Sequence, residues 1–206
     1  MHGTIALMGG GPFTANDDLD RRLLGSTAQV VVLPTADAFE EPGALVAAAV
    51  AWGERLGVEI EALMVMQRHD ADDEGAATVV REAAAVYLVG DSSMHLRSAL
   101  KETAVFGALV HVARNGGLVA AVGPSAAALC DPMLDQRGGA FTLGLGLVSG
   151  VAVIPDADSW SEERRTRTLS LADTPLVELP VGSALLRLAD GWELVGDATV
   201  HGELPS

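Results

Sequence analysis

The segment of this sequence that is best suited to carry chemistry surrounds Ser125. An apolar run at residues 118–122 leads into Gly123-Pro124-Ser125, and small helix-forming residues follow directly. A strand, a sharp turn and a helix in this order place a serine hydroxyl at the carboxyl edge of a parallel sheet, near a helix N-terminus that favours developing negative charge. The alternative is that Ser125 only caps the helix, a common role of serine at such a position. The pattern therefore predicts either a nucleophile in a strained elbow or a helix cap.

A second strand and turn has the same shape. The run at residues 85–89 ends at Gly90, and Asp91 leads into the next helix. Because the ends of neighbouring parallel strands face one crevice, the backbone N–H groups of Gly90 and Asp91 could join that of Ala126 in an oxyanion hole. Gly90 could instead serve only the turn, while Ser92 or its neighbour caps the helix.

The elements that would position these turns alternate along the chain. Short apolar runs rich in Val, Ile and Leu indicate strands covered on both faces, at residues 4–8, 29–34, 59–65, 85–89 and 118–122. Apolar residues at three- and four-residue spacing predict helices at residues 17–24, 42–56, 73–84, 93–102 and 105–114. This alternation predicts an α/β fold with a doubly wound, mainly parallel sheet.

The pattern changes after Ser125. A short helix to Cys130, a Gly-rich stretch at 138–150, an apolar run at 151–154 and a charged helix at 161–171 are expected. The remaining apolar runs, at 177–179, 184–188 and 192–195, predict antiparallel strands that extend the sheet, the last two joined as a hairpin. No linker or repeat interrupts the pattern, so residues 1–206 are predicted to form a single α/β domain.

Composition excludes several classes of partner. The chain has 13 Lys and Arg against 28 Asp and Glu, a formal net charge of −15, which repels nucleic acids and anionic membranes. Cys130 is the only cysteine, so no intrachain disulfide is expected, and a cytoplasmic location is predicted. No spacing of ligands suggests a metal, and the glycine-rich stretches lack the patterns of nucleotide sites, so no cofactor is expected.

Four stretches, in order, resemble the serine peptidases typified by aspartyl dipeptidase (dipeptidase E) and cyanophycinase. They are residues 8–11 (Met-Gly-Gly-Gly), 30–36 (Val-Val-Val-Leu-Pro-Thr-Ala), 89–91 (Val-Gly-Asp) and 123–128 (Gly-Pro-Ser-Ala-Ala-Ala). The resemblance implies a class I glutamine amidotransferase-like fold. It also implies that Ser125 matches the nucleophile, and that Gly90, Asp91 and Ala126 match the oxyanion region.

One departure from the family pattern concerns the catalytic base. The family's histidine usually follows a proline in the segment after the Gly-rich stretch, and here Pro155 is followed by Asp156. An aspartate with an ordinary pKa of roughly 4 is a far weaker base toward a serine hydroxyl than an imidazole. By resemblance Asp156 therefore occupies the position of the base, but Ser125 is expected to be poorly activated unless the pKa of Asp156 is strongly raised.

Other residues could complete the site. His95 lies in the first turn of the helix after Gly90-Asp91, near the predicted crevice, although a helix N-terminus disfavours the imidazolium. The acidic member of the family's triad lies somewhat after the nucleophile, which makes Asp131 and Asp135 the local candidates. Either carboxylate could equally stabilise its own loop.

Two functions follow from these observations. The first is a serine hydrolase that, by resemblance, cleaves small aspartyl or isoaspartyl peptides through Ser125. The second is a catalytically inactive relative that keeps the fold and binds a small peptide or an amino-acid-derived ligand. An amidotransferase-like domain is a third reading, disfavoured because the residue at the turn is serine and not cysteine. The sequence does not fix the oligomeric state, and a homodimer is one assembly compatible with it.

Overall fold

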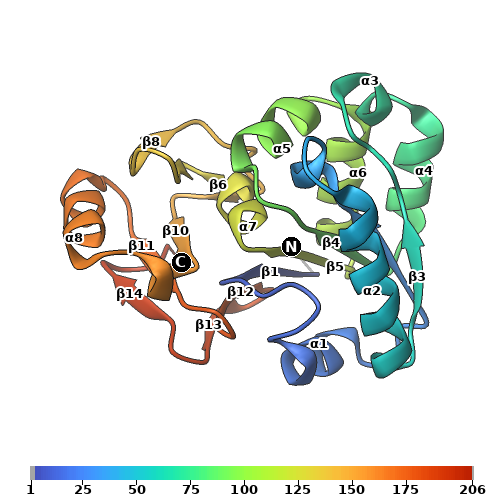
Figure 1. The fold of residues 1–206 in the computed structure, drawn as a ribbon, viewed down its shortest axis with the longest axis horizontal. Coiled ribbons are helices and arrows are strands. Elements are labelled where there is room, and N and C mark those ends of the chain that lie inside the picture. Colours follow the sequence, from blue (N-terminus) through green and yellow to red (C-terminus); the bar gives the residue numbers. More distant parts are fainter. Residues whose placement is uncertain (1–2, 206) are drawn as a thin grey trace.

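A seven-stranded sheet forms the centre of the computed structural model, which describes residues 3–205 (Figure 1). The strand order is β13-β12-β1-β5-β4-β2-β3. The first five strands of the chain pair in parallel, whereas β12 and β13 run antiparallel beyond β1. The bounds are β1 (Thr4–Met8), β2 (Gln29–Leu33), β3 (Glu59–Ala62), β4 (Ala85–Leu88), β5 (Leu118–Val122), β12 (Ala184–Leu188) and β13 (Gly191–Val195). This arrangement confirms the predicted α/β fold and the hairpin at its C-terminal end.

Helices cover both faces of the sheet (Figure 1). One face packs on α1 and α2, and the other packs on a layer that includes α4, α5, α6 and α7. The bounds are α1 (Asp17–Leu24), α2 (Pro42–Leu56), α3 (Arg68–Ala71), α4 (Glu74–Glu82), α5 (Ser93–Leu100), α6 (Ala104–Arg114), α7 (Pro124–Leu129), α8 (Glu162–Leu171), and the 3₁₀ turns η1 (Thr35–Asp37) and η2 (Ala157–Ser159). In residues 3–205, no helix is long and apolar enough to cross a bilayer.

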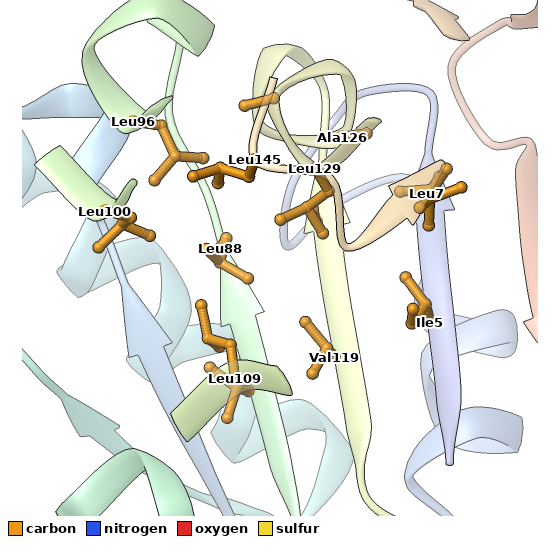
Figure 2. Packing of buried hydrophobic residues seen from close by; sticks show 14 of the residues in the cluster. Ile5, Leu7, Leu88, Leu96, Leu100, Leu109, Val119, Ala126, Leu129 and Leu145 are labelled. Atoms are coloured by element: carbon orange, nitrogen blue, oxygen red, sulfur yellow. The ribbon is translucent and has the colours of Figure 1, made fainter. Parts of the chain in front are cut away.

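Burial on both faces explains why the central strands are continuously apolar. Every residue of β4 and β5 is buried, and Figure 2 shows Leu88 and Val119 facing Leu109 and Leu129 from the helices of one layer. Removing such side chains from water stabilises the fold by roughly 25 cal/mol per Å² of apolar surface. The two strands that carry the predicted site are therefore held rigidly from both sides.

The C-terminal third departs from the sequence prediction. The run predicted at 177–179 forms β11 (Leu176–Leu179), which does not extend the main sheet. It pairs in parallel with β10 (Ala152–Pro155) and antiparallel with β14 (Thr199–His201) in a separate three-stranded sheet. The prediction that this run is an antiparallel strand extending the main sheet is wrong, because the pairing partners of short apolar strands depend on tertiary packing. Two smaller pairs join β6 (Cys130–Asp131) to β9 (Val148–Ser149) and β7 (Met133–Asp135) to β8 (Ala140–Thr142).

Candidate active site

Loops from three adjacent strands meet at the carboxyl edge of the main sheet. Gly9 follows β1, Gly123 follows β5 and Gly90 lies just beyond β4; β1 pairs with β5, and β5 with β4. The small sheet contributes a fourth segment, because Asp156 directly follows β10 and its N–H donates to the Gly9 carbonyl at 2.8 Å. The fold thus brings Ser125, Gly90 and Asp156 to one place, as expected for strands that end at the same edge.

The turn that precedes Ser125 is made by glycine and proline. Gly123 is the N-cap of α7 and has φ 62°, ψ −137°, which a residue with a side chain rarely adopts. Pro124 occupies the first helical position, where its fixed φ is favourable. Ser125 is the second residue of the helix and does not have a positive φ. Gly123, and not Ser125, has the strained backbone conformation and is the N-cap of the helix. The predictions of a strained serine and of a serine N-cap are therefore both wrong.

The Ser125 side chain is buried in this conformation. The residue has no solvent-exposed surface, and its Oγ donates a hydrogen bond to the Gly90 carbonyl at 3.2 Å. The nucleophile candidate therefore lies against the β4 turn, as the pairing of the two turns predicted. Its hydroxyl points to an acceptor and not to a base.

Two of the three N–H groups expected to form an oxyanion hole, those of Asp91 and Ala126, donate to other acceptors, and Gly90 directs its carbonyl toward the serine. Gly90 presents its carbonyl oxygen to Ser125, the Asp91 N–H donates to Asp37 Oδ1 at 3.2 Å, and the Ala126 N–H donates to the Gly123 carbonyl at 2.9 Å. An oxyanion requires N–H donors directed at the position where the negative charge develops. This conformation therefore provides the components of the hole without their productive orientation.

Asp156 lies beside the Ser125 turn in a left-handed backbone conformation, with φ 50° and ψ 38°. A side chain at Gly10 would collide with Asp156 Oδ1, and a Cβ at Gly123 would lie 3.5 Å from Oδ2. The carboxylate is thus wedged between the glycine loops that follow β1 and β5. The absence of a side chain at Gly10 leaves room for the carboxylate in this position.

The environment of Asp156 shifts its ionisation strongly. The pKa of Asp156 is raised to about 6, chiefly by burial and to a smaller extent by the nearby carboxylates of Asp158 and Asp91. The pKa of Asp91 is itself raised, first by burial and then by Asp37 and Glu40. Because an ordinary imidazole titrates near 6.5, Asp156 titrates in the range that a histidine base would occupy.

A pocket of about 410 Å³ opens beside Asp156. Its wall contains carboxylates, guanidinium groups and an indole ring, contributed by Asp91, Pro124, Gln136, Arg137, Pro155, Asp156, Ser159, Trp160 and Arg164. The Arg164 guanidinium lies 3.5 Å from the centre of the Trp160 ring, a cation–π contact that holds both at the wall. Pro124, which precedes Ser125, contributes to the pocket wall, whereas Ser125 itself is buried and does not line the pocket.

The two remaining candidates are bonded elsewhere. The His95 ring Nε2 contacts the Met66 carbonyl at 2.7 Å, so this nitrogen must carry a proton and donate. The Asp131 Oδ1 accepts from the Gly144 N–H at 3.3 Å and thereby organises the Gly-rich segment. Within residues 3–205, neither side chain is hydrogen-bonded to Ser125. Their participation in catalysis stays a prediction that the geometry does not favour.

Sequence reasoning missed several residues of this site. Asp37 follows the resembling stretch 30–36 by one position, and Arg137 and Trp160 lie in loops whose placement depends on the tertiary fold. Arg164 belongs to the charged helix predicted at 161–171, where the sequence alone did not distinguish a site residue from a solvated one. In the described part of the chain, no group of three or more His, Cys, Asp or Glu side chains is arranged to hold a metal ion.

A doubly wound sheet with Ser125 at the strand-turn-helix after β5 defines a hydrolase-type domain with the class I glutamine amidotransferase-like fold. Residues 5–185 match the model of Peptidase family S51, and the chain belongs to this family. The relationship to serine peptidase-like hydrolases that the sequence suggested is thereby confirmed.

Solved structures agree with this assignment. A peptidase from an acI-B1 actinobacterium is 25% identical, with a TM-score of 0.85 over 98% of this chain and 90% of that one. A putative peptidase E protein from Listeria monocytogenes EGD-e is 17% identical and similar in fold, with a TM-score of 0.75 over 94% of this chain and 98% of that one. No match was found among curated proteins.

Proposed function

We propose that this chain is a serine hydrolase of the S51 type that cleaves small peptides containing an acidic residue, with Ser125 as nucleophile and Asp156 as general base. One observation carries the proposal. The Asp156 carboxylate lies beside the Ser125 turn, in the segment where the resemblance leads us to expect the base, and its pKa is raised to about 6. A carboxylate with this pKa can accept a proton near neutral pH and return it, which an ordinary aspartate cannot do efficiently.

The chemistry would proceed in two steps. Ser125 Oγ attacks the peptide carbonyl carbon while its proton passes to Asp156, directly or through one water. The C–N bond then breaks, and the amine leaves with the proton held by Asp156. In the second step a water molecule attacks the acyl-enzyme, Asp156 accepts its proton, and the acid product leaves as the proton returns to Ser125.

The pocket suits a small zwitterionic ligand. Asp91 and Asp156 can receive an α-ammonium group, and Arg137 and Arg164 can receive a carboxylate of the ligand. This combination supports an amino-acid-derived ligand or a dipeptide with an aspartyl or isoaspartyl residue, since such molecules carry both charges within a few ångströms. A nucleic acid would meet a chain of net charge −15.

Catalysis requires Ser125 to change its hydrogen bond. Its hydroxyl must turn from the Gly90 carbonyl toward the base, which forfeits one neutral hydrogen bond worth about 1 kcal/mol. This cost is small compared with the roughly 8 kcal/mol or more by which enzymes typically lower activation barriers. The observed orientation is therefore compatible with a resting state.

The test combines covalent labelling and turnover. Native protein, Ser125→Ala and Asp156→Asn are incubated with a fluorophosphonate, and adducts are located by mass spectrometry. Hydrolysis of aspartyl and isoaspartyl dipeptides is measured in parallel. The proposal expects labelling of native protein at Ser125 and loss of turnover in both variants. Asp190→Asn removes the same charge from the exposed turn between β12 and β13, at the opposite end of β1, and should behave as native.

A second candidate function is an inactive relative that binds the same class of ligand without hydrolysing it. The buried Ser125 hydroxyl and its bond to the Gly90 carbonyl favour this reading. It expects no labelling of native protein, together with calorimetric binding of an aspartyl dipeptide that Arg164→Gln weakens. Absence of both labelling and turnover would reject the hydrolase, and absence of binding would reject both functions.

A further inference from the structure

We propose that Asp37 is a positioning residue that holds the Gly90–Asp91 peptide in the orientation in which its N–H cannot serve Ser125. The inference rests on the proposed hydrolase function and identifies a residue that controls it. The resting orientation of this peptide is then fixed by Asp37, a residue that does not line the pocket. Removing the Asp37 carboxylate should then make the serine more reactive, which is the opposite of what structural damage produces.

Both ends of one peptide group are restrained. Its carbonyl, on Gly90, accepts the hydrogen bond from Ser125 Oγ at 3.2 Å. Its N–H, on Asp91, donates to Asp37 Oδ1 at 3.2 Å. Because the C=O and N–H of a planar trans peptide point in opposite directions, the carboxylate on one side fixes the carbonyl toward the serine on the other.

The surrounding backbone keeps Asp37 in place. Asp37 ends η1, the 3₁₀ turn directly after β2, and its own N–H donates to the Pro34 carbonyl at 3.0 Å. A Cβ at Gly90 would lie 2.6 Å from the Asp37 nitrogen, so the turn packs directly on the glycine. The Ser92 N–H also donates to the Ala36 carbonyl at 3.0 Å. The carboxylate therefore faces the peptide from a segment that has little freedom to move.

The charge on Asp37 distinguishes the two orientations. A hydrogen bond from an N–H to a carboxylate is stronger than one between neutral groups. If the peptide turned by half a rotation, the Asp91 N–H would face Ser125 and could stabilise an oxyanion. The Gly90 carbonyl would then face the carboxylate, and two acceptors would repel each other. Gly90, with φ 118°, is the residue type that tolerates such a rotation.

Asp37→Asn tests the inference with an almost unchanged shape. The introduced amide can accept from the Asp91 N–H or donate to a rotated carbonyl, so it no longer favours the resting orientation. The fluorophosphonate labelling rate of Ser125 should rise at least about tenfold, the ratio that corresponds to about 1.4 kcal/mol. Glu40→Gln is the matched control, because Glu40 also acts on Asp91 through its charge but makes no hydrogen bond to this peptide within residues 3–205. If native protein is labelled, an unchanged or slower rate in Asp37→Asn would overturn the inference.

A crystal structure of Asp37→Asn separates this inference from the proposed function. The Gly90 carbonyl should be turned away from Ser125 in at least part of the molecules, whether or not the protein hydrolyses peptides. A carbonyl that still faces Ser125 in all molecules would overturn the role of Asp37. If no protein is labelled but the carbonyl rotates, the hydrolase proposal fails while the positioning role stands.

Discussion

Replacing Asp156 with asparagine is expected to stabilise the protein at neutral pH. The substitution keeps the shape of a side chain that is wedged against Gly10, and asparagine readily adopts the left-handed conformation observed here, φ 50°. It removes a charge that is partly desolvated and repelled by Asp158 and Asp91. The native fold should therefore carry a penalty at this position that the variant lacks.

The size of the penalty follows from the shifted pKa. The pKa of Asp156 is raised from an ordinary 3.8 to about 6, which corresponds to about 3 kcal/mol at 1.36 kcal/mol per pH unit. Solvent screening of a half-buried group reduces this to about 1–2 kcal/mol. The penalty applies above pH 6, where the folded protein holds Asp156 ionised. It disappears as the pH falls from 6 toward 3.8, because the folded state then binds the proton that the unfolded state does not.

Urea denaturation at pH 7.5 and pH 4.5 measures the effect. The free energy of unfolding of Asp156→Asn should exceed that of native protein by about 1–2 kcal/mol at pH 7.5, and by much less at pH 4.5. The exposed Asp190→Asn variant controls for the change in net charge. A variant that is equally or less stable at pH 7.5, or a gain that is the same at both values, would refute the reasoning.

The same variant should lose activity if the hydrolase proposal holds. A general base typically contributes at least about 100-fold to the rate, so kcat/KM should fall by that factor or more. Gain of stability with loss of activity would identify Asp156 as a residue kept for function at the expense of stability. Loss of both would indicate a structural role only.

Three further predictions concern the supporting residues. Gly10→Ala should displace the Asp156 carboxylate and reduce kcat/KM at least about tenfold while circular dichroism stays native, since the introduced methyl would collide with Oδ1; unchanged kinetics would contradict this placement. In native protein kcat/KM should fall as the pH drops through about 6, and Asp158→Asn should move this midpoint to lower pH because it removes one raising charge; an unmoved midpoint would exclude Asp156 as the titrating base. Tyr87→Phe deletes the 2.8 Å hydrogen bond to buried Asp20, whose pKa burial raises to about 6, and should reduce unfolding stability by about 1–3 kcal/mol at pH 7.5 but less at pH 4.5, where Asp20 is protonated; urea titrations with equal losses at both values would argue against an ionised Asp20.

The local sequence pattern predicted strands and helices well where a single requirement, burial of one or both faces, determined the residue types. The strands β1 (Thr4–Met8) and β5 (Leu118–Val122) and the helices α1 (Asp17–Leu24) and α2 (Pro42–Leu56) have the predicted bounds. Strands buried on both faces must be apolar throughout, and helices on a sheet must be apolar on one side. The predicted strand at 59–65 ends at Ala62 instead, because β3 is an edge strand that pairs with β2 alone, and the register with β2 ends there.

The meaning of the Ser125 turn could not be settled by its residue types. Gly-Pro-Ser after a buried strand is compatible with a strained serine, a serine cap or the arrangement observed, in which Gly123 takes the unusual backbone conformation. The choice depends on what surrounds the helix N-terminus. Here the Gly90 carbonyl, 35 residues earlier in the chain, accepts the serine hydroxyl.

The sequence by itself placed Ser125 in the turn and helix that follow a strand of a parallel sheet, and its resemblance to the family led us to expect Asp156 at the position of the family's histidine. These features depend on residue type and order. The tertiary structure alone decided that Asp156 titrates near pH 6 and that Asp37 restrains the Gly90–Asp91 peptide. Both depend on burial and on charges contributed by distant segments, and such long-range proximity is not encoded in local pattern.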